Sequence, residues 1–184
     1  AKPFRTRPYA IPIAHQPEFD RIIQEMVDHD ILEPTVSNYL SPCFTIVKPD
    51  GTSRFLVDAR KINECLENET CNTPTIRNII DFVSISQPTI FSKIDFRQAF
   101  HQIPLAKHCR HLITIITYSG QCFAYRKLCQ GVSSSSGLCQ NTLNSYIKSF
   151  PDLAKSCITF VDDCLVMSKN IKEHLKTLDK LFQV

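Results

Sequence analysis

The sequence lacks a long hydrophobic run. No apolar stretch approaches the roughly 20 residues that a membrane-spanning helix needs. It also lacks the basic, apolar and small-residue pattern of a secretory signal, any internal repeat, and any low-complexity tract beyond the serines at 133–136. These absences argue against membrane and secreted proteins, so we expect an intracellular protein with no membrane partner.

The nine cysteines lack a pairing pattern. None forms a Cys-x-x-Cys motif, the count is odd, and several lie in apolar runs, where a free thiol behaves as a small hydrophobic group. We therefore interpret them as reduced thiols in an intracellular protein.

Large charge excess is absent as well. The formal net charge is +3, which is compatible with a nucleic-acid partner but does not demand one. With 184 residues, 43% of them hydrophobic and 21% charged, the chain can form one large domain or two small subdomains.

Apolar periodicity and turn residues predict an irregular alternation of helices and hairpins. The first sixteen residues, rich in proline and basic groups, should form an extended arm. The expected helices run from Pro17 to about Ile31, ended by Pro34; from the cap Thr75; from Ser133 to about Lys148; and from the cap Asn170. The expected strands are about Cys43–Lys48, Arg54–Val57, Thr89–Ile94, Leu112–Thr117, Gln121–Arg126, Cys157–Val161 and Cys164–Met167.

Each helix should turn one apolar face inward. The residues expected there are Phe19, Ile22, Ile23, Met26, Val27 and Ile31; Ile76, Ile79, Ile80 and Val83; Cys139, Leu143, Tyr146, Ile147 and Phe150; and Leu175, Leu178 and Leu181 with Ile171. Because hairpins dominate, the pattern favours an α+β fold with an antiparallel sheet.

The pair Asp162-Asp163 lies between two short apolar strands and should form the tip of a tight hairpin. Asp tolerates the unusual backbone angles of such a turn. Adjacent carboxylates repel each other, so stability does not favour the pair, whereas oxygen-rich sites of this kind bind magnesium. Taken alone, an Asp-Asp turn is usually only a solvated tip.

Asp95 ends the apolar strand before it. If that strand lies beside the hairpin of Asp162 and Asp163, the three carboxylates converge and could hold two magnesium ions about 3.5–4 Å apart. The alternative is that Asp95 only caps a helix over residues 96–100.

These segments resemble the motifs of retroelement reverse transcriptases. Residues 91–103, FSKIDFRQAFHQI, resemble the first catalytic-aspartate motif, and residues 160–163, FVDD, resemble the aromatic-x-Asp-Asp box, with Phe160 where Tyr is commoner. Residues 7–12, 31–34 with 41–42, 47–60 and 173–175 are similar to segments of gypsy-like long-terminal-repeat retrotransposons, in the same order.

The resemblance implies a right-hand polymerase made of fingers and palm, with an antiparallel palm sheet. Fingers would be about 1–70 and 103–134, and palm about 71–102 and 135–184. The sequence ends at Val184, so we expect the thumb to be absent. The implied activity is RNA-directed DNA polymerisation on a primed RNA or DNA template with dNTP. The thumb and ribonuclease H regions of a larger polyprotein would be partners, in the cytoplasm, a virus-like particle or the nucleus.

The resemblance also assigns roles to single residues. Asp95 and Asp162 would be the main Mg²⁺ ligands with Asp163 assisting, and Mn²⁺ could substitute. Lys48 and Arg54 flank the fingers turn and would contact the triphosphate; the alternative is that both only solvate a hairpin tip.

Four further residues would line the nucleotide site. Gln130-Gly131 would contact nucleotide and template, although Cys129 stands where the family usually has Pro, and so does Ser136. Phe96 would lie at the nucleotide, and Phe100 would be an aromatic gate against a 2′-hydroxyl.

Two rival hypotheses remain open. A truncated or co-opted retroelement fragment would bind nucleic acid or protein without catalysis. An RNA-dependent RNA polymerase would share the palm, but it would want a small residue or a 2′-hydroxyl partner at Phe100, so that ring argues against it.

Overall fold

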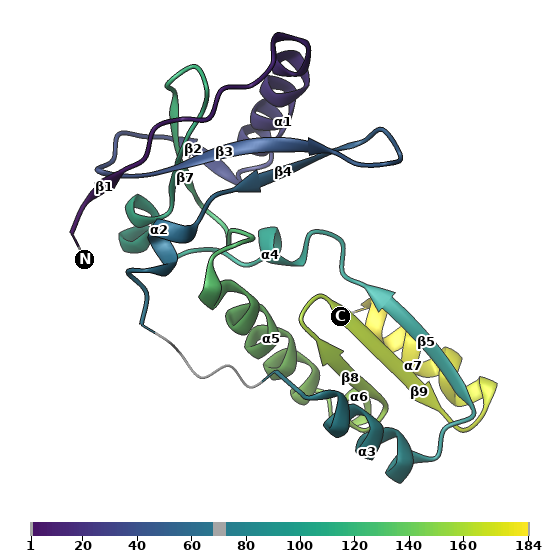
Figure 1. Cartoon of the computed structure of the whole chain (residues 1–184). Coiled ribbons are helices and arrows are strands. Elements are labelled where there is room, and N and C mark those ends of the chain that lie inside the picture. Colours follow the sequence, from purple (N-terminus) through teal and green to yellow (C-terminus); the bar gives the residue numbers. More distant parts are fainter. Residues whose placement is uncertain (1, 68–72, 184) are drawn as a thin grey trace. The chain divides into compact units, whose positions relative to one another are not determined.

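The computed structural model describes residues 2–67 and 73–183, and the chain divides into two compact units (Figure 1). The first unit comprises Ala1–Asn68 and Phe100–Ser135, and the second comprises Glu69–Ala99 and Ser136–Val184. Both mix helices with strands, as the α+β expectation requires.

A six-stranded sheet organises the first unit. Its order is β1 (Phe4–Arg5), β3 (Tyr39–Val47), β6 (Thr114–Ile116), β7 (Cys122–Tyr125) and β2 (Leu32–Pro34), with β4 (Ser53–Val57) paired to β3. The hairpins β3–β4 and β6–β7 join expected strands around the turns at Asp50-Gly51 and Ser119-Gly120. The expected arm of sixteen residues is extended only up to Pro12, because Ile13–His15 form a 3-10 turn and Gln16 begins α1. Its β1 pairs in parallel with β3.

Helix α1 (Gln16–Asp28) covers the core of this unit. Its fully or largely buried residues are Phe19, Ile23 and Met26, on the expected face. The expected end of the helix at Pro34 is wrong, because the chain leaves the helix at His29 and Asp30 takes a left-handed φ of 58°. Leu32–Pro34 then pairs with β7 as a strand, so sheet pairing overrides the helical pattern.

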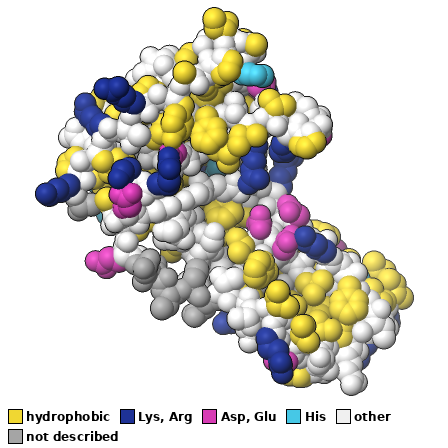
Figure 2. All heavy atoms as spheres, in the orientation of Figure 1, with side chains coloured by type: hydrophobic (Ala, Val, Ile, Leu, Met, Phe, Trp, Pro, Cys, Tyr) yellow, Lys and Arg dark blue, Asp and Glu magenta, His cyan; other side chains and the backbone are white. Residues whose placement is uncertain are grey.

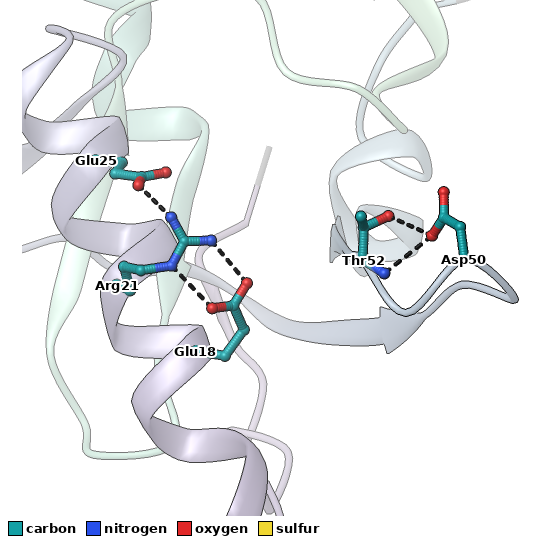
Figure 3. Close-up of polar contacts among 5 residues, drawn as sticks. All are labelled: Glu18, Arg21, Glu25, Asp50 and Thr52. Carbon is teal, nitrogen blue, oxygen red and sulfur yellow. Dashed lines mark hydrogen bonds and ion pairs between the residues drawn. The ribbon is translucent and has the colours of Figure 1, made fainter.

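The short elements of the first unit are helical turns. They are η1 (Ile13–His15), α2 (Arg60–Asn63), α4 (Ala99–Gln102), whose first residue belongs to the second unit, and η2 (Lys107–Leu112). On the surface of α1, Arg21 forms ion pairs with Glu18 and Glu25 (Figure 3). These groups are solvent-exposed, so the pairs add little to stability.

The second unit contains the expected antiparallel sheet. Its order is β5 (Ile90–Asp95), β9 (Asp163–Ser168) and β8 (Cys157–Phe160), and every pairing is antiparallel. The helices are α3 (Ile76–Ser86), α5 (Ser133–Lys148, which begins in the first unit), α6 (Pro151–Ser156) and α7 (Ile171–Gln183).

One face of this sheet packs on the helices. Cys164 and Val166 of β9 are fully buried with Leu153 of α6 and Leu181 of α7. Two helix starts follow the expected caps. Thr75 forms a reciprocal capping box with Asn78, and the Asn170 side chain accepts the amide of Glu173 at 3.0 Å.

The inward faces expected for α3 and α7 are partly wrong. α3 has no buried residue, and Ile76 and Ile80 are exposed, because no described element covers that side of the helix.

On α7 the buried residues are His174 and Leu181, whereas Ile171 and Leu175 are exposed. The packed stripe of α7 is therefore rotated toward His174, which is hydrogen-bonded to Ser92 and Ser168. On α5, Tyr146 is also exposed, whereas Cys139 and Ile147 are buried as expected.

Candidate active site

Strand pairing in the second unit places two of the expected carboxylates side by side. Asp95, the last residue of β5, is paired directly with Asp163, the first residue of β9. Directly opposed residues of an antiparallel pair lie on one face of the sheet, and Phe160 of β8 continues that row. Asp162 occupies the turn, and its carbonyl accepts the amide of Phe96 at 2.8 Å. Two segments far apart in sequence thus bring the three aspartates to one end of the sheet.

A lysine lies on the same face. Alternation along β5 puts Lys93 on the side of Asp95, and its Nζ lies 2.9 Å from Oδ2 of Asp163. The pKa of Lys93 is raised, first by this hydrogen bond and the charge of Asp163, and further by the charges of Asp95 and Asp162. In Figure 2, acidic side chains gather at this strand end with a basic side chain against them. The sequence analysis did not single out Lys93.

The carboxylate of Asp163 is only partly satisfied. Its Oδ2 pairs with Lys93, whereas its Oδ1 is buried without a hydrogen-bond partner. A buried, unpaired carboxylate oxygen is costly unless a cation or a donor reaches it. This orphaned oxygen and the all-carboxylate donor set fit a hard divalent cation.

The three carboxylates do not form a ready-made cage. Among residues 2–67 and 73–183, no three His, Cys, Asp or Glu side chains are grouped so that they could hold a metal ion. The carboxylates repel one another, and Lys93 already forms an ion pair with Asp163. The magnesium site stays a prediction.

The turn before the two aspartates is strained. Asp162 and Asp163 were expected to take the unusual backbone angles, but the left-handed residue is Val161, with φ of 55°. This conformation is unfavourable for a β-branched residue, and it persists only where surrounding contacts hold it.

Gln140 of α5 supplies those contacts. Its side chain is fully buried, and its Oε1 accepts the amide of Val161 at 2.7 Å. Its Nε2 donates to the carbonyl and hydroxyl oxygens of Thr159 at 3.1 and 2.8 Å, and the Thr159 hydroxyl donates to Asn144 at 2.7 Å. The sequence analysis missed Gln140. Its spacing to Asn144 and Ile147, which puts all three on one helical face, was the available signal.

The first unit carries the expected cationic hairpin. Arg54 of β4 pairs with Ile46, and the Lys48 amide donates to Thr52 at 2.8 Å, which extends the ladder toward the turn. Gly51 has φ of 81°, and Asp50 accepts both the amide and the hydroxyl of Thr52 (Figure 3). Lys48 and Arg54 are both exposed beside this braced turn.

Asn63 braces the loop of Gln130 and Gly131. Its amide nitrogen donates to the carbonyl of Gly131 at 3.0 Å, and its oxygen accepts the amide of Ser133 at 2.8 Å. Gly131 has φ of 95°, and a Cβ there would lie 3.4 Å from the Val57 carbonyl. Glycine is therefore favoured twice, by the backbone angle and by the close approach. The sequence analysis missed Asn63.

The two phenylalanines expected at the nucleotide, Phe96 and Phe100, are both packed. Phe96 contacts the hydrophobic core of the second unit. Phe100 is 8% exposed and is assigned to the first unit. Both sites are ordinary core positions for Phe, so their contact with a nucleotide stays a prediction.

A cavity of about 860 Å³ lies in the first unit, apart from the residues expected to bind substrate. Tyr9, Asp58 and Arg60 form its polar corner, where Asp58 Oδ2 accepts from the Tyr9 hydroxyl and from Arg60, each at 2.6 Å. The bonds from Arg60 are the main cause that holds the pKa of Asp58 well below its usual range.

Comparison with known proteins identifies the family. Residues 46–184 match the family described as reverse transcriptase (RNA-dependent DNA polymerase). The chain belongs to the reverse transcriptase family. The expected likeness to gypsy-like retrotransposons is confirmed as well.

The curated relatives of this reverse transcriptase domain are polyproteins. It is 26% identical to the retrovirus-related Pol polyprotein from transposon 297 of Drosophila melanogaster over 98% of the chain, and 25% identical to that from transposon gypsy over 88%. It is 24% identical to the enzymatic polyprotein of cauliflower mosaic virus (strain Strasbourg) over its whole length. The chain spans 17%, 16% and 27% of these relatives.

Solved structures share the fold of this reverse transcriptase domain. Prototype foamy virus protease-reverse transcriptase matches all of the chain with a TM-score of 0.86 at 23% identity, and the chain covers 24% of that protein. The foamy viral enzyme in complex with RNA/DNA hybrid matches with a TM-score of 0.81 at 22% identity, where the chain again covers 24%. The expected α+β fingers–palm fold is confirmed. Among the described residues, no helix has the length and apolar character to cross a membrane.

Proposed function

We propose that this chain is the catalytic core of an RNA-directed DNA polymerase. The observation that carries the proposal is the pairing of Asp95 with Asp163 on one sheet face, with Asp162 in the adjoining turn. Three carboxylates at one strand end can hold two metal ions, and such a pair of ions suits nucleotidyl transfer from dNTP to a primer 3′-hydroxyl. The first unit would be the fingers and the second the palm.

Asp95, Asp162 and Asp163 would hold two Mg²⁺ or Mn²⁺ ions. Bound there, the metal would lower the pKa of the primer 3′-hydroxyl and neutralise phosphate charge. Because Asp95 and Asp163 are direct partners in the pairing of β5 with β9, metal binding would need little movement of the strands. The Oδ1 of Asp163 has no hydrogen-bond partner that a metal ion would have to displace.

Residues of the first unit would handle the substrates. Arg54 would contact the triphosphate as a planar fork, and Lys48 as a point charge. Gln130 would hydrogen-bond near the sugar, and Gly131 would let its backbone approach the nucleotide, in a loop held by Asn63. Phe96 and Phe100 would lie at the base and sugar.

The partners follow from the same proposal. A primed RNA or DNA template and dNTP would be substrates, and the thumb and ribonuclease H regions of a larger polyprotein would complete the binding surface. Foamy viral protease-reverse transcriptase has been solved in complexes with double-stranded DNA and with RNA/DNA hybrid, which supports such a duplex here. An intracellular location stays a prediction.

The test is single-nucleotide addition to a primed RNA template at low salt, with Mg²⁺ or Mn²⁺. We expect the chain to add one dNTP slowly and Asp162→Asn to lose the activity by several orders of magnitude, because a metal ligand is removed. Lys172→Met, an exposed change on α7, is the matched control.

The outcomes separate the proposal from its rival. Duplex binding without nucleotide addition by the unaltered chain would favour a co-opted fragment that binds without catalysis. Equal activity in the unaltered chain and in Asp162→Asn would remove the aspartates from the chemistry.

A further inference from the structure

Lys93 lies beside two aspartates of the proposed metal site, Asp95 and Asp163. It lies two residues before Asp95 on the same face of β5, and diagonally across from Asp163. Its ammonium is 2.9 Å from Oδ2 of Asp163.

In the ion pair between Lys93 and Asp163, the lysine can be displaced from the carboxylate by another cation. The Lys93 side chain is 69% exposed, so its ammonium can return to water at little cost. The Asp163 carboxylate is 32% exposed and keeps its Oδ1 buried without a partner. The fixed side of the pair is therefore the carboxylate, and the movable side is the cation.

A divalent ion that binds Asp163 must share the carboxylate with this ammonium or displace it. Two positive charges about 4–5 Å apart repel each other even near the surface of a protein. Strand pairing fixes the backbone of Asp95 and Asp163, so the flexible lysine is the group that yields.

We propose that Lys93 is a positioning residue that sets the affinity of the aspartate site for its divalent ion by competing for Asp163. This inference rests on the proposed metal site and adds a residue that tunes it. Lys93 neutralises the carboxylates and makes them less attractive to a metal ion. Removing its charge should tighten metal binding rather than weaken it.

The experiment titrates Mn²⁺ alone into the chain and follows the signal of free Mn²⁺ by electron paramagnetic resonance. We expect Lys93→Met to lower the dissociation constant about tenfold, because one positive charge beside a doubly charged ion is removed. Lys93→Arg keeps the charge and should stay close to the unaltered chain. Lys172→Met removes one exposed charge elsewhere in the same unit and should change nothing.

Two further variants locate the effect. Asp162→Asn should weaken Mn²⁺ binding in every background. In an Asp163→Asn background, Lys93→Met should lose most of its effect, because the group for which the lysine competes is gone. Circular dichroism melting of each variant checks that the fold is kept, and an exposed lysine is not expected to alter it.

The results separate two failures. If the unaltered chain binds Mn²⁺ and Asp162→Asn weakens binding, but Lys93→Met binds no more tightly, the inference about Lys93 is overturned and the metal site stands. If the unaltered chain binds no Mn²⁺, or Asp162→Asn leaves binding unchanged, the metal site itself is overturned, and the inference with it.

Discussion

The burial of Phe100 is compatible with the role that we propose for it as a gate at the nucleotide. Its side chain is 8% exposed, so most of the ring already contacts protein. A gate against a 2′-hydroxyl needs only one edge of the ring to face the nucleotide, and a crowded, unsatisfied hydroxyl costs a few kcal/mol. Burial alone therefore does not decide between the two roles.

Phe100→Val should change sugar selection. The smaller side chain leaves space for a 2′-hydroxyl, so we expect incorporation of ribonucleotides relative to deoxynucleotides to rise on the order of a hundredfold. The measurement is single-nucleotide addition to a primer with ribonucleotide and deoxynucleotide in competition, by a form of the protein that is active in primer extension.

Phe123→Val is the matched control for this change. Phe123 is also 8% exposed and lies in the core of the first unit. Both variants should lose stability, on the order of 1–3 kcal/mol, but only Phe100→Val should alter the sugar ratio. If the two variants discriminate equally well, Phe100 is a core residue and the gate hypothesis is wrong.

Other single residues were beyond the reach of sequence patterns. The meeting of Asp95 with Asp162 and Asp163 at one end of the sheet could be predicted, because an acidic residue at the end of an apolar strand is a local signal. Lys93 and Gln140 could not, because each acquires its role from a partner in another element. A lysine on an exposed strand face and a glutamine in a helix are common, and only the sheet register and the packing of α5 give them their contacts.

At the scale of elements, the hairpin β8–β9 depends on helix α5. Gln140 holds Val161 in a left-handed conformation and satisfies Thr159. Leucine at 140 would fill similar space but leave the Val161 amide unpaired and remove the donor to the carbonyl and hydroxyl oxygens of Thr159, and an unpaired buried group costs about 1–3 kcal/mol.

Gln140→Leu should therefore release the hairpin. We expect the Val161 amide to lose protection from hydrogen exchange and the free energy of unfolding to fall by about 2–4 kcal/mol. Asn141→Leu, a change at the exposed neighbouring position, should leave both quantities close to those of the unaltered chain. A Val161 amide that stays protected in Gln140→Leu would show that the turn holds itself.

The elements themselves were predictable where the signal was local. Asp50-Gly51 and Ser119-Gly120 marked two hairpins, and Thr75 and Asn170 marked two helix starts. Pairings between distant segments left no such mark, so the strands Phe4–Arg5 and Leu32–Pro34 were missed. The exposed Ile76 and Ile80 show the opposite error, because a periodic apolar face predicts a helix but not the element that covers it.

At the scale of the whole molecule, the modest net charge hides an uneven distribution of cations. Several basic residues of the first unit are already neutralised, such as Arg60 by Asp58 and Lys61 by Glu64. Within the described part of the chain, no ion pair joins Lys48 or Arg54 to a carboxylate. Those two exposed residues of the β3–β4 hairpin are therefore available to phosphate groups.

Neutralising both hairpin cations should reduce the salt dependence of duplex binding. Each phosphate contact adds about 0.9 to the slope of log K against log salt concentration, because bound counterions are released. The double variant Lys48→Gln with Arg54→Gln should therefore reduce the magnitude of this slope by about two and weaken binding at low salt.

Lys61→Gln is the matched control, because the lysine that it removes is already ion-paired with Glu64. The measurement is fluorescence anisotropy of a labelled RNA/DNA hybrid across a salt series. A double variant with the slope of the unaltered chain would mean that the hairpin only solvates its own tip and that other residues contact the duplex.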